Sequence, residues 1–313
     1  MPVEFLTHEQ KQQYGCYTDT PNEIQLARYF HLDEFDLAQI AKRRGKHNRL
    51  GFALQITTVR FLGTFISNFD NVPAVVSRFV ARQLGISSLS VLNWYAQRKN
   101  TQWEHHREIK QVYGYWELTD STYGFRLMRQ LYSRAWITNE RPSVLFDHGT
   151  AWLIENRVLL PGVSILSRLV AEIRERAATR LWSKLASMLD DHHKRALYAL
   201  LDNGEEGGRL SRLERLRKGP TTVSGPAFVS AVKRYEQIAN IPIPAKAFDT
   251  LPAARVKAIA RHATTTSVTK IARMSESKKL SMLLAFVHTH RFSTLDDAID
   301  ILDMLITQIV STA

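Results

Sequence analysis

Six basic or potentially basic side chains lie between Lys42 and Gly51, around a single glycine, in the segment Lys-Arg-Arg-Gly-Lys-His-Asn-Arg-Leu-Gly. Guanidinium and ammonium groups pair with phosphates. The apolar run that begins at Phe52 indicates that a helix starts within this segment, and a helix start offers free backbone N–H groups to an anion. The chemistry that these residue types predict is therefore phosphate binding.

The basic residues of this segment are expected to neutralise phosphates without reading sequence. They are Arg43, Arg44, Lys46 and Arg49. One alternative stays open: Arg43 and Arg44 could pair instead with the acidic residues of the preceding turn, and Arg44 could face the core. Those acidic residues are Asp33, Glu34 and Asp36.

Two further residues in the segment, His47 and Asn48, are polar and planar. Such side chains can reach base edges in the major groove, where asparagine pairs naturally with adenine. The segment thus predicts both phosphate contacts and base contacts.

An acidic run near the end of the chain could be drawn as a two-metal centre. It consists of Asp296, Asp297, Asp300 and Asp303. Its spacing favours a helix start instead, with Ser293 or Thr294 as the cap and the first acids complementing the helix dipole. We therefore predict no catalytic residues, no metal ligands and no cofactor in this segment.

The composition is that of an ordinary core-forming protein with an excess of basic charge. Hydrophobic residues make up 44% of the chain, charged residues 23%, and the formal net charge is +12. The excess is spread along the chain, which suits a long anionic partner such as duplex DNA. Cys16 is the only cysteine, so neither an internal disulfide nor a thiolate zinc site is expected. A secretory signal and a membrane span are not expected either.

Hydrophobic periodicity predicts helices nearly everywhere and no strand, hence an all-α fold. The expected helices cover residues 22–30, 33–44, 49–62, 73–84, 102–112, 121–133, 142–157, 163–189, 209–218, 251–263, 278–289 and 293–309.

An internal repeat is visible in the first part of the chain. A Tyr-Gly pair at Gly15 recurs at Gly114, and a buried helix opening at Gly51 and closing at Gly63 would match residues 149–162. These correspondences predict two related helix-turn-helix-like bundles, 1–98 and 99–189, followed by a third helical region, 190–313, for DNA binding or assembly.

The second module is less basic at the matching turn than the first. In the second module the matching turn would supply Arg141 and Ser143, with His148 just before the helix. In the third region a short amphipathic helix would extend the footprint. Its cations are Arg209, Arg212, Arg215 and Lys218.

Several stretches of this sequence resemble the N-terminal region of Tn-three-family transposases (TnpA). The likeness rests on residues 28–32 (Arg-Tyr-Phe-His-Leu), 40–55 (Ile-Ala-Lys-Arg-Arg-Gly-Lys-His-Asn-Arg-Leu-Gly-Phe-Ala-Leu-Gln) and 58–63 (Thr-Val-Arg-Phe-Leu-Gly). It continues more weakly beyond residue 170, through the acidic run.

The resemblance implies sequence-specific binding to the terminal inverted repeats of a transposon during replicative transposition. It also implies that the magnesium-binding Asp-Asp-Glu triad lies beyond residue 313, so this segment would not itself be an enzyme. The expected partner is double-stranded DNA, with a possible homodimer of the full-length protein. The expected location is the bacterial cytoplasm, in association with the nucleoid.

Two alternatives stay open at this point. One is a naturally short regulator that occupies transposon ends without chemistry. The other is a helical dimerisation scaffold whose basic charge is incidental.

Overall fold

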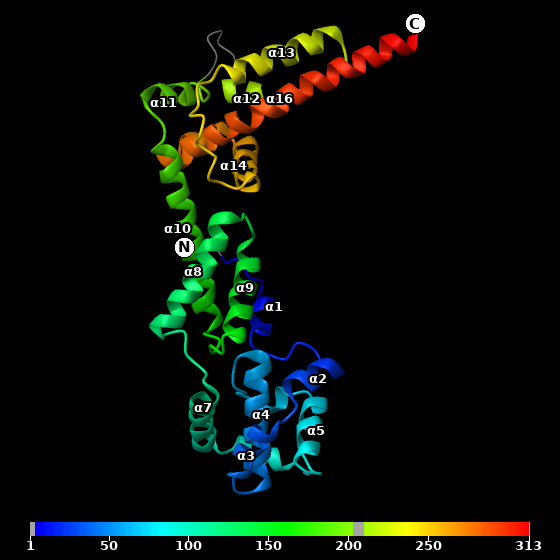
Figure 1. The fold of residues 1–313 in the computed structure, drawn as a ribbon, viewed down its shortest axis with the longest axis vertical. Helices are drawn as coiled ribbons and strands as arrows, with labels where there is room; N and C mark the ends of the chain where they lie inside the picture. The colour runs from blue at the N-terminus through cyan, green and yellow to red at the C-terminus, as the bar shows by residue number, and fades with distance from the viewer. Residues whose placement is uncertain (1–3, 203–209, 313) are drawn as a thin grey trace. The chain divides into compact units, whose positions relative to one another are not determined.

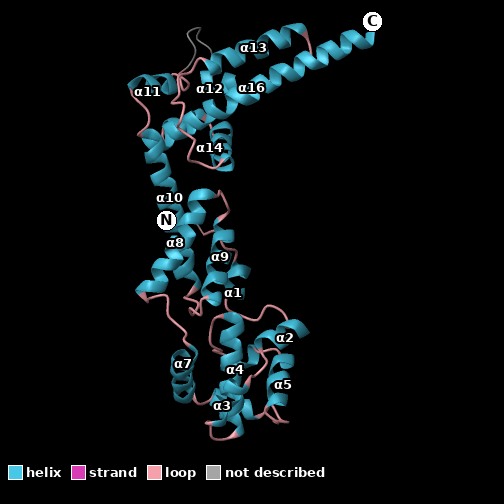
Figure 2. Ribbon diagram, in the orientation of Figure 1, coloured by secondary structure: helices cyan, strands magenta, loops and turns pink. Residues whose placement is uncertain are grey.

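The computed structural model describes residues 4–202 and 210–312, and within these ranges it contains helices and no strand (Figure 2). The all-α prediction is confirmed. A single isolated bridge joins Trp116 and Val158, where the Trp116 N–H donates to the Arg157 carbonyl over 2.9 Å.

Contacts divide the chain into two compact units. Unit 1 comprises residues 1–132 and 141–173, and unit 2 comprises residues 133–140 and 174–313. The three-region division expected from the sequence, with its boundaries near residues 98 and 189, stays a prediction.

Unit 1 is built around one buried helix, α4 (Lys46–Leu62), with α2, α3, α5, α6 and α7 packed against it (Figure 1). Ten consecutive residues of α4, from Leu50 to Val59, are buried. The other helices of this unit are α1 (His8–Gln13), α2 (Glu23–Tyr29), α3 (Glu34–Ala41), η1 (Phe69–Asn71), α5 (Ala74–Gln83), α6 (Val91–Ala96), α7 (Lys99–Tyr113) and α9 (Pro142–Glu155).

Two longer helices contribute residues to both units: α8 (Ser121–Ile137) and α10 (Val163–Ala186). The remaining helices belong to unit 2. They are α11 (Asp191–Tyr198), α12 (Arg212–Arg217), α13 (Gly225–Ala239), α14 (Ala253–Thr265), α15 (Val268–Ala272) and α16 (Glu276–Thr312).

Unit 2 packs around the first half of α16, where residues 280–287 are all buried. Helices α13 and α14 both lie along this 37-residue helix (Figure 1). The expected break between residues 289 and 293 is wrong. Thr294 does not cap a helix start: it is buried within α16 and its hydroxyl donates to the His290 carbonyl over 2.6 Å. No glycine or proline interrupts the segment, so the helix continues.

Reciprocal side-chain caps explain where several helices begin. Asn22 and Gln25 cap α2, Asp33 and Asp36 cap α3, and a similar pair caps α12. Each pair satisfies two backbone N–H groups that would otherwise be unpaired at a helix start.

The proposed repeat is matched in part by local geometry. Gly15 and Gly114 both adopt left-handed backbone angles, with φ of 68° and 67°. The helices preceding them differ, however, since α1 has 6 residues and α7 has 15. Gly162 does not end a helix as Gly63 does, because α9 ends at Glu155 and the Gly162 carbonyl accepts the Leu166 N–H of α10. The duplication itself stays a prediction.

Candidate nucleic-acid interface

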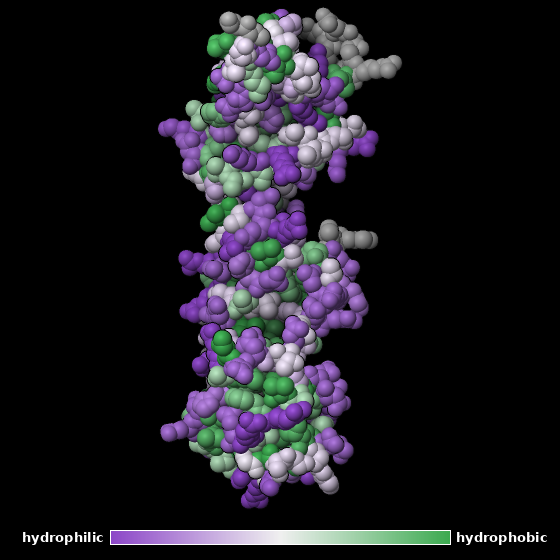
Figure 3. All heavy atoms as spheres, turned by 90° about the vertical axis from the view of Figure 1, so that its right-hand side faces the viewer, coloured by the Kyte–Doolittle hydropathy of each residue, from purple (hydrophilic) through white to green (hydrophobic). Residues whose placement is uncertain are grey.

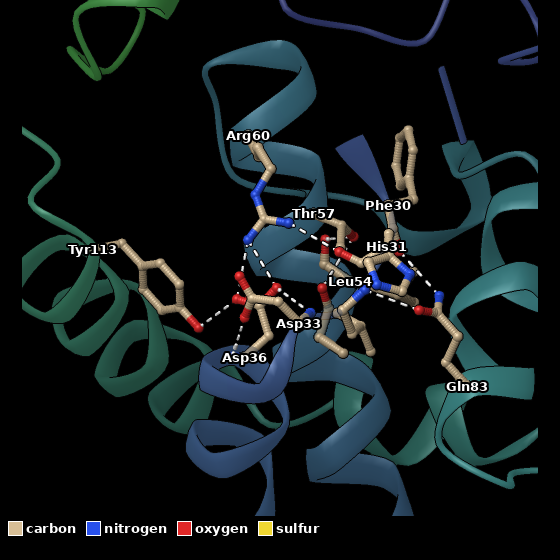
Figure 4. Close-up of polar contacts among 11 residues, drawn as sticks. Phe30, His31, Asp33, Asp36, Leu54, Thr57, Arg60, Gln83 and Tyr113 are labelled. Atoms are coloured by element: carbon tan, nitrogen blue, oxygen red, sulfur yellow. Dashed lines mark hydrogen bonds and ion pairs between the residues drawn. The ribbon is translucent and has the colours of Figure 1, made fainter. Parts of the chain in front are cut away.

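A buried carboxylate joins α3 to α4 through an ion pair (Figure 4). Asp36 accepts two hydrogen bonds from the Arg60 guanidinium, at 3.0 and 2.9 Å, and one from the Tyr113 hydroxyl at 2.9 Å. Arg60 also donates to the His31 carbonyl, at 3.1 Å. Burial, together with the Asp36 carboxylate, raises the pKa of Tyr113, so its hydroxyl stays protonated and donates. The network ties α3, α4 and α7 together.

A second set of hydrogen bonds joins the segment before α3 to α5 (Figure 4). The Gln83 amide accepts from the Leu32 N–H at 2.8 Å and donates to the Phe30 carbonyl at 3.0 Å. Because a glutamine amide can both accept and donate, one side chain satisfies both backbone groups. The loop leading into α3 is thereby anchored.

Gly45 makes the turn from α3 into α4. Its φ is +81°, a backbone angle that favours glycine, and a Cβ here would lie 2.8 Å from the His47 ring, which would have to shift. Gly45 has no side chain to cap α4. The start of α4 therefore presents N–H groups without a side-chain cap.

Three of the predicted cations are exposed around this turn, as expected from the sequence. Arg44 and Lys46 are exposed, and Arg49 is exposed while its Nε donates to the Arg43 carbonyl at 3.0 Å. The alternative in which Arg44 faces the core is therefore wrong. Figure 3 shows one face of the molecule coloured by hydropathy. Hydrophilic residues are scattered widely over this face, with smaller apolar patches between them.

Arg43 is placed differently from its neighbours. Its guanidinium pairs with Glu108 of α7 and lies 4.3 Å from the centre of the Phe52 ring. The alternative pairing of Arg43 with Asp33, Glu34 or Asp36 is not formed: Arg43 pairs with Glu108, and Asp36 pairs with Arg60. Arg43 thus secures α7 against α4.

His47 and Asn48 are half-buried rather than fully presented to solvent. The Asn48 amide donates to the Arg44 carbonyl at 3.0 Å. His47 Nε2 and Asn48 Oδ1 are shielded and have no hydrogen-bond partner within the described residues. The two side chains lie beside the exposed cations with one polar atom each still to be satisfied.

The residues predicted to contact DNA in the second module lie at and within α9. Arg141 is exposed at its N-cap, and Ser143 is partly buried in its first turn. His148 is exposed, but it does not precede the helix as expected. The helix begins at Pro142, a residue type suited to a first helical position, and so includes His148.

The cations predicted for the third region divide between exposed and partly buried positions. Arg215 and Lys218 are exposed, whereas Arg212 is partly buried and its guanidinium lies 3.5 Å from the Gln237 carbonyl. Arg209 lies outside the described residues. The predicted residues therefore fall into three local groups, at the α3–α4 turn, at α9 and at α12.

Sequence reasoning missed a shallow pocket of about 380 Å³ at the end of α5. Arg78 and Arg82, both exposed, line it together with Gly85 and Ser87. The i, i+4 spacing of two arginines on the polar face of an amphipathic helix is the sequence signal that could have found it.

Within the described ranges, no three His, Cys, Asp or Glu side chains are grouped so that they could hold a metal ion. In the acidic run, Asp297 is paired with Arg234 at 2.7 Å. None of the described helices is long and apolar enough to cross a membrane.

Known transposases are similar to this chain along its whole length. The chain is 53% identical to the transposase for transposon gamma-delta of Escherichia coli (strain K12), over 100% of this chain and 31% of that protein. It is 27% identical to the transposase for transposon Tn1546 of Enterococcus faecium, over 98% of this chain, and 28% identical to that for transposon Tn2501 of Escherichia coli, over 99%. The chain thus spans about 31% of the length of the relatives it matches first.

A family model described as a domain of unknown function, DUF4158, matches residues 5–173. This match ends at the same residue as unit 1. Together with the relatives, it shows that the chain belongs to the Tn3 (Tn-three) family of transposases and corresponds to their N-terminal region.

Proposed function

We propose that this chain binds duplex DNA at the terminal inverted repeats of a transposon, as the end-recognition part of a replicative transposase. One observation carries the proposal: Arg44, Lys46 and Arg49 are exposed together around the start of the buried helix α4. Their backbone is held by the Asp36–Arg60 network, so the cations are presented from a rigid support. Cations and backbone N–H groups at a helix start both favour a phosphate.

The residues of the turn would divide the work. Arg44, Lys46 and Arg49 contact phosphates, while Arg43 supports the site through Glu108 and Phe52. His47 and Asn48 would turn outward on DNA, where base edges satisfy the polar atoms left without partners. Arg141, Ser143 and His148 would supply fewer contacts of the same kind, and Arg215 and Lys218 would extend them.

We infer that strand cleavage, with its magnesium, is carried out by a part of the transposase outside these residues. The family resemblance supports this inference, as does the coverage of about 31% of the relatives' length. The same resemblance supports association with the nucleoid. This segment would then need no cofactor to bind DNA.

Fluorescence anisotropy on the whole chain tests the proposal, with a transposon-end duplex and a scrambled duplex titrated over salt. We expect tighter binding to the end duplex. Each phosphate contact contributes about 0.9 to the log–log salt slope, so replacing Arg44, Lys46 and Arg49 by glutamine should reduce the slope by about 2.7.

The matched control is Lys233→Gln, which removes one exposed cation from α13 and should leave the slope unchanged. Replacing His47 and Asn48 by alanine should reduce the preference for the end duplex while leaving binding to the scrambled one. Unchanged binding by the triple variant would rule out the α3–α4 turn as the contact surface.

A further inference from the structure

A row of contacting side chains runs from the α3–α4 turn into the core of unit 1, and we refer to it as the aromatic ladder. Its members come from the turn itself and from α4, α7, α6 and η1. They are, in order, Arg43, Phe52, His105, Tyr95 and Phe69. The three middle members are each at most 5% exposed. The ladder thus joins the turn proposed to bind DNA to elements that follow it in the chain.

The contacts along the aromatic ladder have the geometry that rings and cations prefer. The Arg43 guanidinium lies 4.3 Å from the centre of the Phe52 ring. The His105 ring meets Phe52 nearly edge to face, with ring centres 4.9 Å apart. Tyr95 meets Phe69 in the same way, with ring centres 5.3 Å apart. Because each contact depends on the orientation of a ring, moving one member disturbs the next.

A hydrogen bond fixes the middle of the aromatic ladder. The Tyr95 hydroxyl and His105 Nδ1 are 3.0 Å apart, and the planes of the two rings differ by only 20°. Burial raises the pKa of Tyr95 and lowers the pKa of His105 to about 4, so both groups are neutral. Since both side chains are shielded from water, removing one partner leaves the other with an unpaired polar atom.

Two further contacts hold Tyr95 in place. Gly51 of α4 supplies the space for the Tyr95 ring, since a Cβ there would lie 2.3 Å from it. The buried Gln102 amide of α7 donates to the Tyr95 and Ala96 carbonyls, at 2.9 and 3.0 Å. The inner end of the aromatic ladder is therefore anchored to α4 and α7 at once.

The outer end of the aromatic ladder determines where the backbone of the turn lies. The Arg43 side chain is held by Phe52 and Glu108. The Arg43 carbonyl accepts a hydrogen bond from Arg49 Nε over 3.0 Å, and Arg44 follows Arg43 directly in the chain. A displacement of Arg43 therefore moves both of these exposed cations, together with the polar side chains between them.

We propose that Phe52, His105 and Tyr95 are positioning residues that set the end specificity of the α3–α4 turn without touching DNA. This inference rests on the proposed function and deepens it. Attraction between cations and phosphates tolerates small shifts, whereas hydrogen bonds to base edges depend on precise distance and direction. Loosening the aromatic ladder should therefore reduce the preference for the transposon-end duplex and change binding to a scrambled duplex by less than about twofold.

Fluorescence anisotropy with the two duplexes compares Phe52→Leu with Phe61→Leu in the whole chain. Both variants replace an aromatic ring of α4 by leucine, but Phe61 lies near the other end of the helix and stacks on Tyr17. We expect Phe52→Leu to reduce the end preference by about fivefold or more, which corresponds to one base contact, and Phe61→Leu by less than about twofold. Equal losses would overturn the proposal, since a general loosening of α4 would then explain both.

Tyr95→Phe, made alone and together with His105→Phe, tests the hydrogen bond within the aromatic ladder. The single variant leaves His105 Nδ1 buried and unpaired, so the end preference should fall. The double variant keeps a ring at each position and leaves no polar atom of the pair unsatisfied, so it should recover most of the preference. A double variant with no more preference than Tyr95→Phe would overturn the part assigned to this pair.

Hydrogen exchange of the turn without DNA separates this inference from the proposed function. Phe52→Leu should speed exchange over residues 43–49, whereas Phe61→Leu should not. Unchanged exchange there would overturn the positioning role even in a chain that prefers the end duplex. An unaltered chain without end preference would overturn the proposed function, and the exchange rates would still decide whether the aromatic ladder holds the turn.

Discussion

The central helix of each unit is buried to a different extent. In unit 1, α4 is buried along ten consecutive residues, and its most exposed residues, Lys46 and Arg49, lie at its start. In unit 2, α16 is surrounded over residues 280–287, after which a row of apolar side chains is exposed. Helix α4 presents positive charge at its start, whereas α16 presents an apolar side. The exposed cations of α4 are the basis of the DNA contact proposed for unit 1.

The arginines differ between the units in a related way. In unit 2, Arg217 donates to the carbonyls of Ala263 and Thr266, and Arg291 donates to those of Ala239 and Ile241. Burial lowers the pKa of both guanidinium groups. These cations stabilise helix ends and loops, so the net positive charge of unit 2 overstates what it can offer to DNA.

The largest difference in stability between the units is expected when the buried Asp36 carboxylate of unit 1 loses its partner. Arg60→Met leaves Asp36 buried without its cation and should cost about 3 kcal/mol of unfolding free energy. Arg234→Met in unit 2 leaves Asp297, which is 39% exposed and so better solvated, and should cost about 1 kcal/mol.

Hydrogen exchange read by mass spectrometry under native conditions can follow each unit separately. Arg82→Met, which removes an exposed arginine from α5, should change stability by less than about 0.5 kcal/mol. Equal losses from Arg60→Met and Arg234→Met would show that the two ion pairs are equally buried in solution, against the comparison.

The next effect concerns two glycines that the sequence suggests are equivalent. A Cβ on Gly51 would lie 2.3 Å from the Tyr95 ring, so Gly51→Ala should destabilise α4 by about 2 kcal/mol through overpacking. A Cβ on Gly149 would meet leucine side chains only at 3.6 Å, an ordinary contact.

Gly149→Ala should therefore raise the free energy of unfolding by about 0.5 kcal/mol, because alanine has a higher helix propensity than glycine. Denaturant unfolding of the two variants measures this contrast. Similar losses at the two glycines would mean that α9 is packed as closely as α4.

The smallest effect is expected from acid pH. A fall in pH should lower the free energy of unfolding of both units and so reduce the difference between them. Burial lowers the pKa of His105 to about 4, and burial also lowers the pKa of His290 in unit 2. In the unfolded chain histidine titrates near 6.5, so unfolding takes up protons below that pH. Stability present above about pH 6.5 is lost as the pH falls towards 4.

Between pH 7 and pH 5 the loss from His105 should be about 1–2 kcal/mol. Unfolding at a series of pH values measures it, and His105→Gln should make unit 1 less sensitive over that interval. A pH profile identical to that of the unaltered chain would show that His105 is not buried as a neutral group.

Local sequence determined much of unit 1. The apolar period predicts α4, and Gly45 predicts the turn before it, because these signals act within a few residues. The exposure of Lys46 and Arg49 follows from their place at a helix start. The all-helical class was predictable for the same reason.

Only the tertiary structure decided which of two adjacent arginines is exposed. Arg43 and Arg44 cannot be distinguished by their local sequence. Arg43 pairs with Glu108, which is 65 residues away in the chain. Similarly, the Ser293–Thr294 pair has the composition of a helix cap, yet packing of Ala298 and Ile301 on α13 accompanies an unbroken α16. Side-chain pairing and burial depend on residues distant in the chain, and local propensity contains no information about them.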